Sequence, residues 1–210
     1  MNLNCLKRLP THVGIAMSGG IDSVVMFDVA LSLGRKVTIF TFDHKLENSE
    51  EEVNFAIELG KTHGCEVKIG QASLEVPKGQ SKEAYWSTER NNWFNEFEMF
   101  IATGHHLNDV AEWYLMTMAT GNGGHYMRYS NQNVVRPLIV TPRAKIEEYA
   151  ASKNLQYLTD ETNGDVTFNK RNRVRHNLLP EVLDVNPGFL TSIKNNILRK
   201  EFPGTRFKDQ

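Results

Sequence analysis

The chain has 210 residues, 40% of them hydrophobic and 23% charged, which is typical of a soluble globular protein with a sizeable core. Its two cysteines, Cys5 and Cys65, form no CxxC motif, which argues against a disulfide framework and against a cysteine-bound zinc or iron–sulfur site. The first ten residues contain no apolar signal segment, and no apolar run approaches the length of a membrane span. We therefore expect a cytoplasmic protein with no membrane contact.

The formal net charge of −1 is unevenly distributed along the chain. Residues 1–135 contain 11 Lys and Arg against 16 Asp and Glu, whereas residues 136–210 contain 13 against 9. A basic second half suits contact with a polyanion, although a solvated basic face would give the same count.

Short apolar runs alternate with segments of helical length over the first 150 residues. Strands are predicted at His12–Met17, Val37–Phe42, Val67–Ile69, Met99–Thr103 and Val134–Arg136. Helices are predicted at Ser23–Gly34, Ser49–His63, Ser81–Phe97 and Asn108–Met118, and another begins at Thr141-Pro142. The alternation predicts an α/β fold with a doubly wound, mainly parallel sheet of about five strands and helices on both faces. We assign residues 1–150 to this domain and residues 151–210 to a basic, helical C-terminal extension packed on it.

The loop between the first strand and the first helix has the composition of a phosphate-binding site. It reads Ser18, Gly19, Gly20, Ile21, Asp22, Ser23. Two glycines let the backbone approach a ligand closely, and the helix start behind them supplies free N–H groups and the positive end of a dipole. Asp22 could hold Mg²⁺ against the phosphates. The structural alternative is a Gly-Gly turn that caps a helix. Because no lysine stands where a Walker A loop has one, a kinase-type P-loop is excluded.

These six residues match SGGxDS, so the chain resembles the PP-loop ATP pyrophosphatases. Enzymes of that superfamily adenylate a carbonyl-type oxygen and release pyrophosphate. The resemblance implies ATP and Mg²⁺ as cofactors, with ATP cleaved between its α- and β-phosphates. It also implies that residues 18–23, Asp43 and His105 bind ATP.

Four further segments resemble one branch of that superfamily, the tRNA(Ile)-lysidine synthetases. They are the stretch from Asp43-His44 to Ser49 and Glu52, the helix with Glu83-Ala84 and Arg90, the segment Gly104–Glu112, and a C-terminal set that comprises Arg136-Pro137-Leu138, Asp160–Asn163 and Arg171–Pro180. The chain departs from the family pattern at Lys45–Glu47, Ser87 and Asn108. The resemblance covers about Val13 to Leu183.

Two carboxylates in the Gly104–Glu112 segment suit recognition of an amine. Asp109 and Glu112 are three residues apart in the first turn of a predicted helix, so both lie on one face. Such a pair can grip an ammonium group or accept its proton, although a capping box would use the same residues. The resemblance implies that the amine is free L-lysine and that Asp22, Asp109 and Glu112 are the catalytic residues.

Other polar residues have weaker signals. His105 and His106 are adjacent on a tight loop and are expected to form a pocket wall or loop hydrogen bonds, not a metal site. Arg90 could bind the lysine carboxylate or a phosphate, or lie in solvent. The run Lys170, Arg171, Asn172, Arg173 and Arg175 is dense in positive charge, and with the resemblance we favour phosphates of RNA or ATP as its partner.

The resemblance implies a ligase that adenylates the wobble cytidine of an isoleucine tRNA and attaches L-lysine to it, releasing AMP and pyrophosphate. The expected partners are L-lysine and the anticodon region of tRNA, with a homodimer as an assembly that the sequence allows. Two alternatives are a PP-loop tRNA thiolase, disfavoured because such enzymes commonly need cysteines, and a catalytically silent ATP-binding module.

Overall fold

The computed structural model describes residues 8–45, 49–73, 76–77, 79, 82–159 and 170–203. Several features named above lie outside the described residues, namely Cys5, Leu46, Glu47, the side chain of Glu83, and Asp160–Asn163.

The sheet confirms the predicted fold class. Its order is β3-β2-β1-β4-β6-β5, and every neighbouring pair is parallel except β5 and β6. The strands are β1 (His12–Ala16), β2 (Lys36–Asp43), β3 (Glu66–Gln71), β4 (Ile101–Ala102), β5 (Ser130–Asn131) and β6 (Val134–Val135). The sixth strand, β5, was not predicted because two exposed polar residues have no strand pattern.

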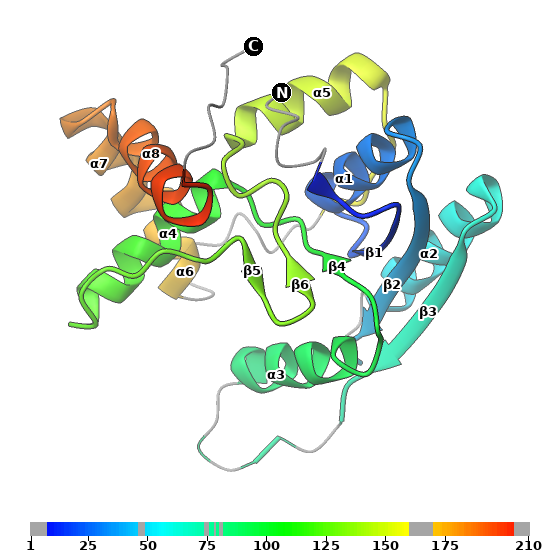
Figure 1. The fold of residues 1–210 in the computed structure, drawn as a ribbon. Helices are drawn as coiled ribbons and strands as arrows, with labels where there is room; N and C mark the ends of the chain where they lie inside the picture. The colour runs from blue at the N-terminus through cyan, green and yellow to red at the C-terminus, as the bar shows by residue number, and fades with distance from the viewer. Residues whose placement is uncertain are drawn as a thin grey trace.

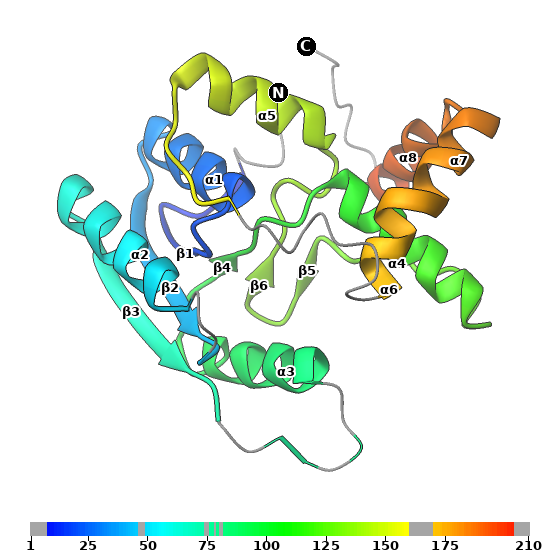
Figure 2. The ribbon, with the colours of Figure 1, turned by 180° about the vertical axis from the view of Figure 1, so that it is seen from behind.

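The helices follow the strands as expected and continue into the C-terminal region. They are α1 (Ile21–Ser32), α2 (Ser49–His63), α3 (Lys82–Phe94), α4 (Leu107–Ala119), α5 (Arg143–Lys153), α6 (Lys170–Arg173), the π-helix η3 (Val174–Leu178), α7 (Leu179–Val185) and α8 (Phe189–Glu201). Figures 1 and 2 show α6, α7 and α8 beside α4, at the opposite end of the molecule from β3 and α2.

Two apolar clusters account for this arrangement. The first joins β1 and β2 to α1 and α5, and includes Ile15, Val25 and Ile146, each fully buried. The second joins α4 to the C-terminal helices through residues such as Val110, Ile193 and Ile197. α4 is thus fixed against the C-terminal helices and against Ile139 and Val140, which follow β6. The proposed division at residue 150 stays a prediction.

Two helix starts differ from the sequence prediction. The N-cap of α4 is His106 and not Asn108. The side chain of Asn108 instead accepts a hydrogen bond from the backbone N–H of Arg143 at 3.0 Å, so it caps the start of α5. The N-cap of α5 is Pro142, one residue later than predicted. Asn108 therefore ties together the two helices that follow β4 and β6.

The aromatic and methionine residues of α3 and α4 have mixed roles. Trp93 packs against Phe40 and Phe94, as expected for a core residue. Met118, by contrast, is 53% exposed and lies outside the core. Among the described residues, no helix combines the length and the apolar composition needed to cross a bilayer.

Candidate active site

The Ser18–Ser23 loop joins β1 to α1 as predicted. Gly19 has a φ of 74°, and Gly20 is the extended N-cap residue of α1. The Ser23 hydroxyl donates to the carbonyl of Gly20 at 2.8 Å, which fixes the turn. No side chain among the described residues caps α1, and the Ser23 N–H donates to the Gly20 carbonyl at 3.1 Å, so the N–H groups of Ile21 and Asp22 are the ones available to an anion.

Two other segments lie directly against this loop. Leu158 donates its backbone N–H to the carbonyl of Gly19 at 2.9 Å, and its side chain fills the space that a Cβ at position 19 would need. A Cβ at Gly104 would come within 3.0 Å of the Asp22 Cβ. Glycine is therefore required at 19 by both φ and space, and at 104 by the close approach of the two loops.

A cavity of about 330 Å³ lies at the carboxyl ends of the strands, in front of the loop. Predicted site residues that line it are Ser18, Asp22, Ser23, Arg90, His105, Asp109 and Arg171. Further lining residues are Ala16, Met17, Phe40, Phe42, His44, Glu52, Phe94, Thr103 and Gly104. Sequence reasoning had not assigned these a role, although their places after β1, β2 and β4 could have identified several.

Asp43 does not line this cavity. Its carboxylate accepts the backbone N–H of Lys45 at 2.7 Å and pairs with the Lys45 ammonium, also at 2.7 Å. This local turn places Lys45 at a φ of 58°. The predicted ATP contact of Asp43 stays a prediction, while its neighbour His44 does line the cavity.

The carboxylate of Asp22 lacks a partner for one of its oxygens. Its Oδ1 is buried without a hydrogen bond, and the closest ionisable nitrogen, His106 Nε2, is 3.7 Å away. Burial raises the pKa of Asp22; the Asp109 charge adds to the rise, while His106 and Arg143 oppose it. A buried carboxylate oxygen without a hydrogen-bond partner, in the first turn of a helix whose start suits a phosphate, fits a divalent cation held with a nucleotide. The site therefore fits the Mg²⁺ implied by the sequence.

The two histidines of the 104–108 loop have different roles. His106 forms a capping box with Asp109: its N–H donates to Asp109 Oδ2 at 2.9 Å, and its Nδ1 accepts the Asp109 N–H at 3.3 Å. His105 Nδ1 is 3.0 Å from the Thr103 hydroxyl. Burial lowers the pKa of His105 to about 4, so this ring is a neutral cavity wall at physiological pH.

Asp109 and Glu112 form a four-membered ion cluster with Arg171 and Arg175. Arg171 Nη2 is 2.5 Å from Asp109 Oδ1, and Arg171 Nε is 2.9 Å from Glu112 Oε2. Arg175 Nη2 is 3.3 Å from Asp109 Oδ1, and Arg175 Nε is 2.7 Å from Glu112 Oε1. The side chains of Asp109 and Glu112 are 8% and 2% exposed, and those of Arg171 and Arg175 are 41% and 19% exposed. The predicted carboxylate pair thus exists and binds cations, here from its own chain.

The electrostatics of Asp109 favour the charged form. Burial raises its pKa, but the charges of His106, Arg171 and His105, with the hydrogen bond from the His106 N–H, outweigh burial, and the net pKa is lowered. A carboxylate with a lowered pKa is a poor proton acceptor at neutral pH. Asp109 is therefore better suited to hold a positive charge than to remove a proton.

The basic run divides between the interior and the surface. Arg171 and Arg175 point into the ion cluster, and Asn172 is buried, whereas Lys170 and Arg173 are exposed. Arg175 lies in the π-helix η3, and single π-turns within helices are frequent at functional sites. A phosphate-binding role for this run stays a prediction.

Two residues that line the cavity, His44 and Arg90, and Trp86, whose ring centroid is 5.8 Å from that of His44, have buried nitrogens without partners. Arg90 Nε, His44 Nδ1 and Trp86 Nε1 are all buried without a hydrogen-bond partner. Burial lowers the pKa of Arg90, and the charge of Arg136 lowers it further; no described acid forms an ion pair with Arg90. Buried polar groups without partners are rare in native structures and often mark a place that a ligand occupies. An anionic ligand group would satisfy these nitrogens.

Comparisons with known proteins agree with this geometry. A model of the PP-loop domain family matches residues 3–182. Among individual proteins, a tRNA(Ile)-lysidine synthase of Francisella tularensis subsp. novicida is 30% identical over 94% of this chain and 55% of its own length. A tRNA(Ile)-lysidine synthase of Persephonella marina is 32% identical over 85% of this chain and 43% of its own length. The chain thus spans about half the length of these relatives.

The solved structures show the fold. A U34-tRNA thiolase, NcsA, from Methanococcus maripaludis superposes with a TM-score of 0.72 at 18% identity, and the match covers 90% of this chain and 70% of the thiolase chain. An NMN synthetase from Francisella tularensis gives a TM-score of 0.51 at 14% identity, over 100% of this chain and 93% of that chain.

The raised pKa of Asp22 predicts that its charge costs stability in the ligand-free protein. Above the folded-state pKa the ionised carboxylate disfavours the folded state, and the cost disappears as the pH falls towards the unfolded-state pKa. We expect Asp22→Asn to have a higher free energy of unfolding than wild type at about pH 7, with a smaller difference at acidic pH. Urea unfolding across pH measures this, and the exposed Asp184→Asn serves as the control. Equal stability of Asp22→Asn and wild type at every pH would contradict the assignment.

The ion cluster predicts an unequal response to two conservative substitutions. Glu112→Gln removes one of the two carboxylates that Arg171 and Arg175 share and leaves both guanidinium groups with Asp109 alone, so we expect a loss of about 1–3 kcal/mol in the free energy of unfolding. Glu147→Gln removes the solvated pair between Glu147 and Arg143, and the change should stay within about 1 kcal/mol. Urea titrations of both variants give the comparison. A loss at Glu112 no larger than that at Glu147 would mean that the cluster contributes nothing to stability.

Proposed function

Because the chain belongs to the PP-loop family, we propose that it uses ATP to activate an RNA base and joins an amine to it. Specifically, we propose that it attaches L-lysine to the wobble cytidine of an isoleucine tRNA and releases AMP and pyrophosphate. The observation that supports this most directly is the carboxylate pair Asp109 and Glu112, which binds positively charged nitrogen and of which Asp109 lines the cavity in front of the nucleotide loop. The relatives named above are lysidine synthases.

In the first step the cytidine O2 attacks the α-phosphorus of ATP, the Pα–O–Pβ bond breaks, and pyrophosphate leaves. In this step the free N–H groups at the start of α1 bind the phosphate oxygens together with Ser18 and Ser23, a role supported by the uncapped helix start and by the place of both serines in the cavity lining. Mg²⁺, held by Asp22, would supply a positive charge to the phosphates. Gly19 and Gly20 let the backbone approach the ligand.

In the second step a lysine amine attacks C2 of the activated base, the C2–O bond breaks, and AMP leaves with that oxygen. The carboxylates of Asp109 and Glu112 hold an amino group of the lysine. Arg90, whose Nε has no partner, receives an anionic group, for which the lysine carboxylate is suited in charge and geometry. His105 stays neutral and forms part of the wall.

Binding of lysine competes with the internal cations. In the ligand-free protein Arg171 and Arg175 occupy the carboxylate oxygens that the substrate would use. Entry of an ammonium group therefore replaces some of these contacts. Arg171, which is the more exposed of the two, is the side chain that we expect to turn away.

A thiolase is the second candidate, because the solved thiolase structure has the same fold. The described cysteine does not favour it. Cys65 follows α2, does not line the cavity, and has a pKa raised by burial, which disfavours the reactive thiolate. The lysidine reaction needs no cysteine. A silent ATP-binding module is the third candidate, and only measured turnover separates it from an enzyme.

The decisive experiment is mass spectrometry of the wobble nucleoside after tRNA, ATP and L-lysine are incubated with the protein. We expect a mass increase equal to lysine minus water, with pyrophosphate release that depends on tRNA. Omission of lysine should abolish the product. Pyrophosphate release without a lysine adduct would favour another PP-loop reaction, and ATP binding with no turnover would favour the silent module.

The lysine site makes a quantitative prediction. A hydrogen bond between a carboxylate and an ammonium group is worth about 1.5–3 kcal/mol, so Asp109→Asn or Glu112→Gln should raise the KM for lysine about 10- to 100-fold. The dissociation constant for ATP should change little in either variant. Glu147→Gln is the matched control outside the cavity. If both variants keep the wild-type lysine dependence, the amine binds elsewhere.

Arg90 provides an independent test of the opposite end of the substrate. Arg90→Gln should lower the activity with lysine. The activity with cadaverine, which lacks the carboxylate, should stay at the wild-type level. Arg90→Lys should recover part of the lysine activity because it restores the charge without the bidentate fork. Steady-state rates with both amines measure the effect. An equal loss with lysine and with cadaverine would show that Arg90 does not bind the carboxylate.

A further inference from the structure

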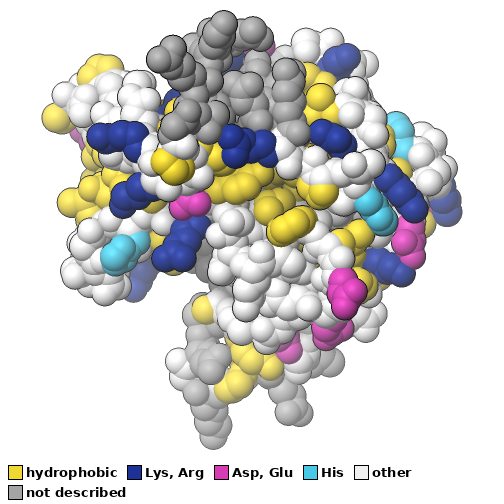
Figure 3. Space-filling model, in the orientation of Figure 1, with side chains coloured by type: hydrophobic (Ala, Val, Ile, Leu, Met, Phe, Trp, Pro, Cys, Tyr) yellow, Lys and Arg dark blue, Asp and Glu magenta, His cyan; other side chains and the backbone are white. Residues whose placement is uncertain are grey.

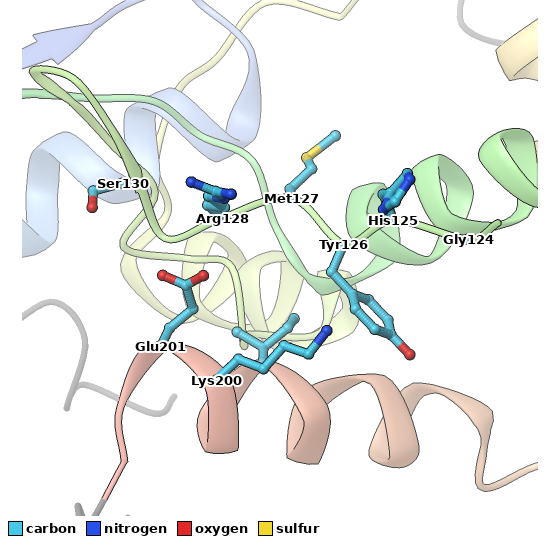
Figure 4. A pocket seen from close by; sticks show the side chains of 9 residues that line it. Gly124, His125, Tyr126, Met127, Arg128, Ser130, Lys200 and Glu201 are labelled. Atoms are coloured by element: carbon cyan, nitrogen blue, oxygen red, sulfur yellow. The ribbon is translucent and has the colours of Figure 1, made fainter. Parts of the chain in front are cut away.

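A second hollow, of about 500 Å³, lies away from the active site between α8 and the segment after α4. No residue assigned to the ATP or lysine site lines it. Its walls are residues 124–128 and Ser130 on one side and Ile197, Lys200 and Glu201 on the other. Figure 4 shows His125 and Arg128 on the segment and Lys200 and Glu201 on α8, facing one another across the space. A volume of this size accommodates a ligand fragment the size of a nucleotide.

The segment that forms one wall is firmly held. The backbone N–H of His125 donates to the Thr117 hydroxyl at 2.9 Å, and the carbonyl of Arg128 accepts from Arg136 Nη1 at 3.1 Å. Gly124 has a φ of 64°, and a Cβ there would meet the Tyr114 ring at 2.7 Å. The hollow is thus built by specific contacts, which makes it more than a gap between loose loops.

Tyr126 orders the floor of the hollow. Its ring stacks on Tyr114 with centroids 4.8 Å apart and an interplanar angle of 11°. Its hydroxyl accepts from Asn196 Nδ2 at 3.1 Å, and Lys200 Nζ lies 5.3 Å from its centroid on α8. The cation–π contact positions the Lys200 ammonium without neutralising its charge.

The charges in the hollow are predominantly positive. Arg128 and Lys200 are both exposed, and within the described residues neither forms an ion pair. The single acid, Glu201, acts on another arginine: burial lowers the pKa of Arg136, and the Glu201 charge opposes that shift. Figure 3 shows Lys and Arg side chains gathered over α8 and the segment after α4. Two permanent cations in a polar hollow favour an anionic ligand.

The position of the hollow relates it to the active site. Asp109 lies in the first turn of α4 and Glu112 in the next, and the segment that lines the hollow follows the other end of that helix. Ten helical residues separate Asp109 from Ala119, a rise of about 15 Å. A strand of RNA whose base enters the cavity can therefore place neighbouring phosphates near the hollow.

We propose that the hollow formed by His125, Arg128 and Lys200 binds the phosphate backbone of the RNA substrate. The identity of the RNA rests on the proposed function, whereas the binding of phosphate by these cations does not. Phosphate contacts position a nucleic acid without reading its sequence. The hollow would hold the anticodon arm while the target base is in the cavity. An acidic protein segment would meet the same cations, and the experiment below separates the two.

The test uses the double variant Arg128→Gln/Lys200→Gln and tRNA binding over a range of salt concentrations. Each phosphate contact contributes about 0.7 to 0.9 to the slope of log K against log salt, so the slope should flatten by about 1.4 to 1.8. The control is Lys61→Gln/Lys153→Gln, which removes two exposed lysines from α2 and α5 and should leave the slope unchanged. ATP affinity and thermal unfolding should match wild type in both variants.

Glu201→Gln adds a test of opposite sign. Removal of the only acid in the hollow should tighten tRNA binding, a result that a purely structural role would not give. An unchanged salt slope in the double variant overturns the proposal. The proposal is also overturned if the double variant loses as much affinity for polyaspartate as for tRNA, because that result would indicate an acidic protein partner. If the slope flattens but no lysine adduct forms, the RNA subsite stands and the lysidine reaction fails. If the lysine adduct forms but the salt slope is unchanged, the lysidine reaction stands and the RNA subsite fails.

Discussion

The N-terminal turn of α4 is the part of the molecule on which the site depends. Asp109 forms the capping box of the helix with His106, lines the cavity and forms an ion pair with Arg171. Glu112, about one turn later, forms ion pairs with both Arg171 and Arg175. The apolar side of the same helix is buried against the C-terminal helices. The carboxylates are therefore fixed by packing on one side and by ion pairs on the other. Few side chains in the described residues combine so many roles.

The fold and the nucleotide loop could be predicted because their signals are local. The alternation of elements gave the parallel sheet, and Gly19 with Gly20 marked the phosphate loop before any contact was known. The pairing of Asp109 with Glu112 followed from helical spacing alone. These inferences use residues that are close in sequence, where backbone geometry decides the result.

The remainder of the site depends on contacts between distant segments. Nothing in the sequence indicated that Arg171 and Arg175 would pair with Glu112, because a basic run on a helix is equally compatible with solvent. Asn108 has the residue type of an N-cap, but its side chain caps α5 and not its own helix. The buried nitrogens of His44, Trp86 and Arg90 became evident only when α3 was placed beside the end of β2.

The contact of Leu158 with Gly19 has a consequence for biosynthesis. The Leu158 N–H holds the Gly19 carbonyl, and its side chain covers the glycine, yet these residues are separated by nearly the whole α/β domain in sequence. Chains emerge from the ribosome with the N-terminus first, and domains fold as their segments appear. The nucleotide loop therefore emerges early but reaches its final shape only after residue 158 has left the exit tunnel. A nascent chain that stalls before that point would present an uncovered loop, which makes the 155–159 segment a late structural checkpoint for the nucleotide loop.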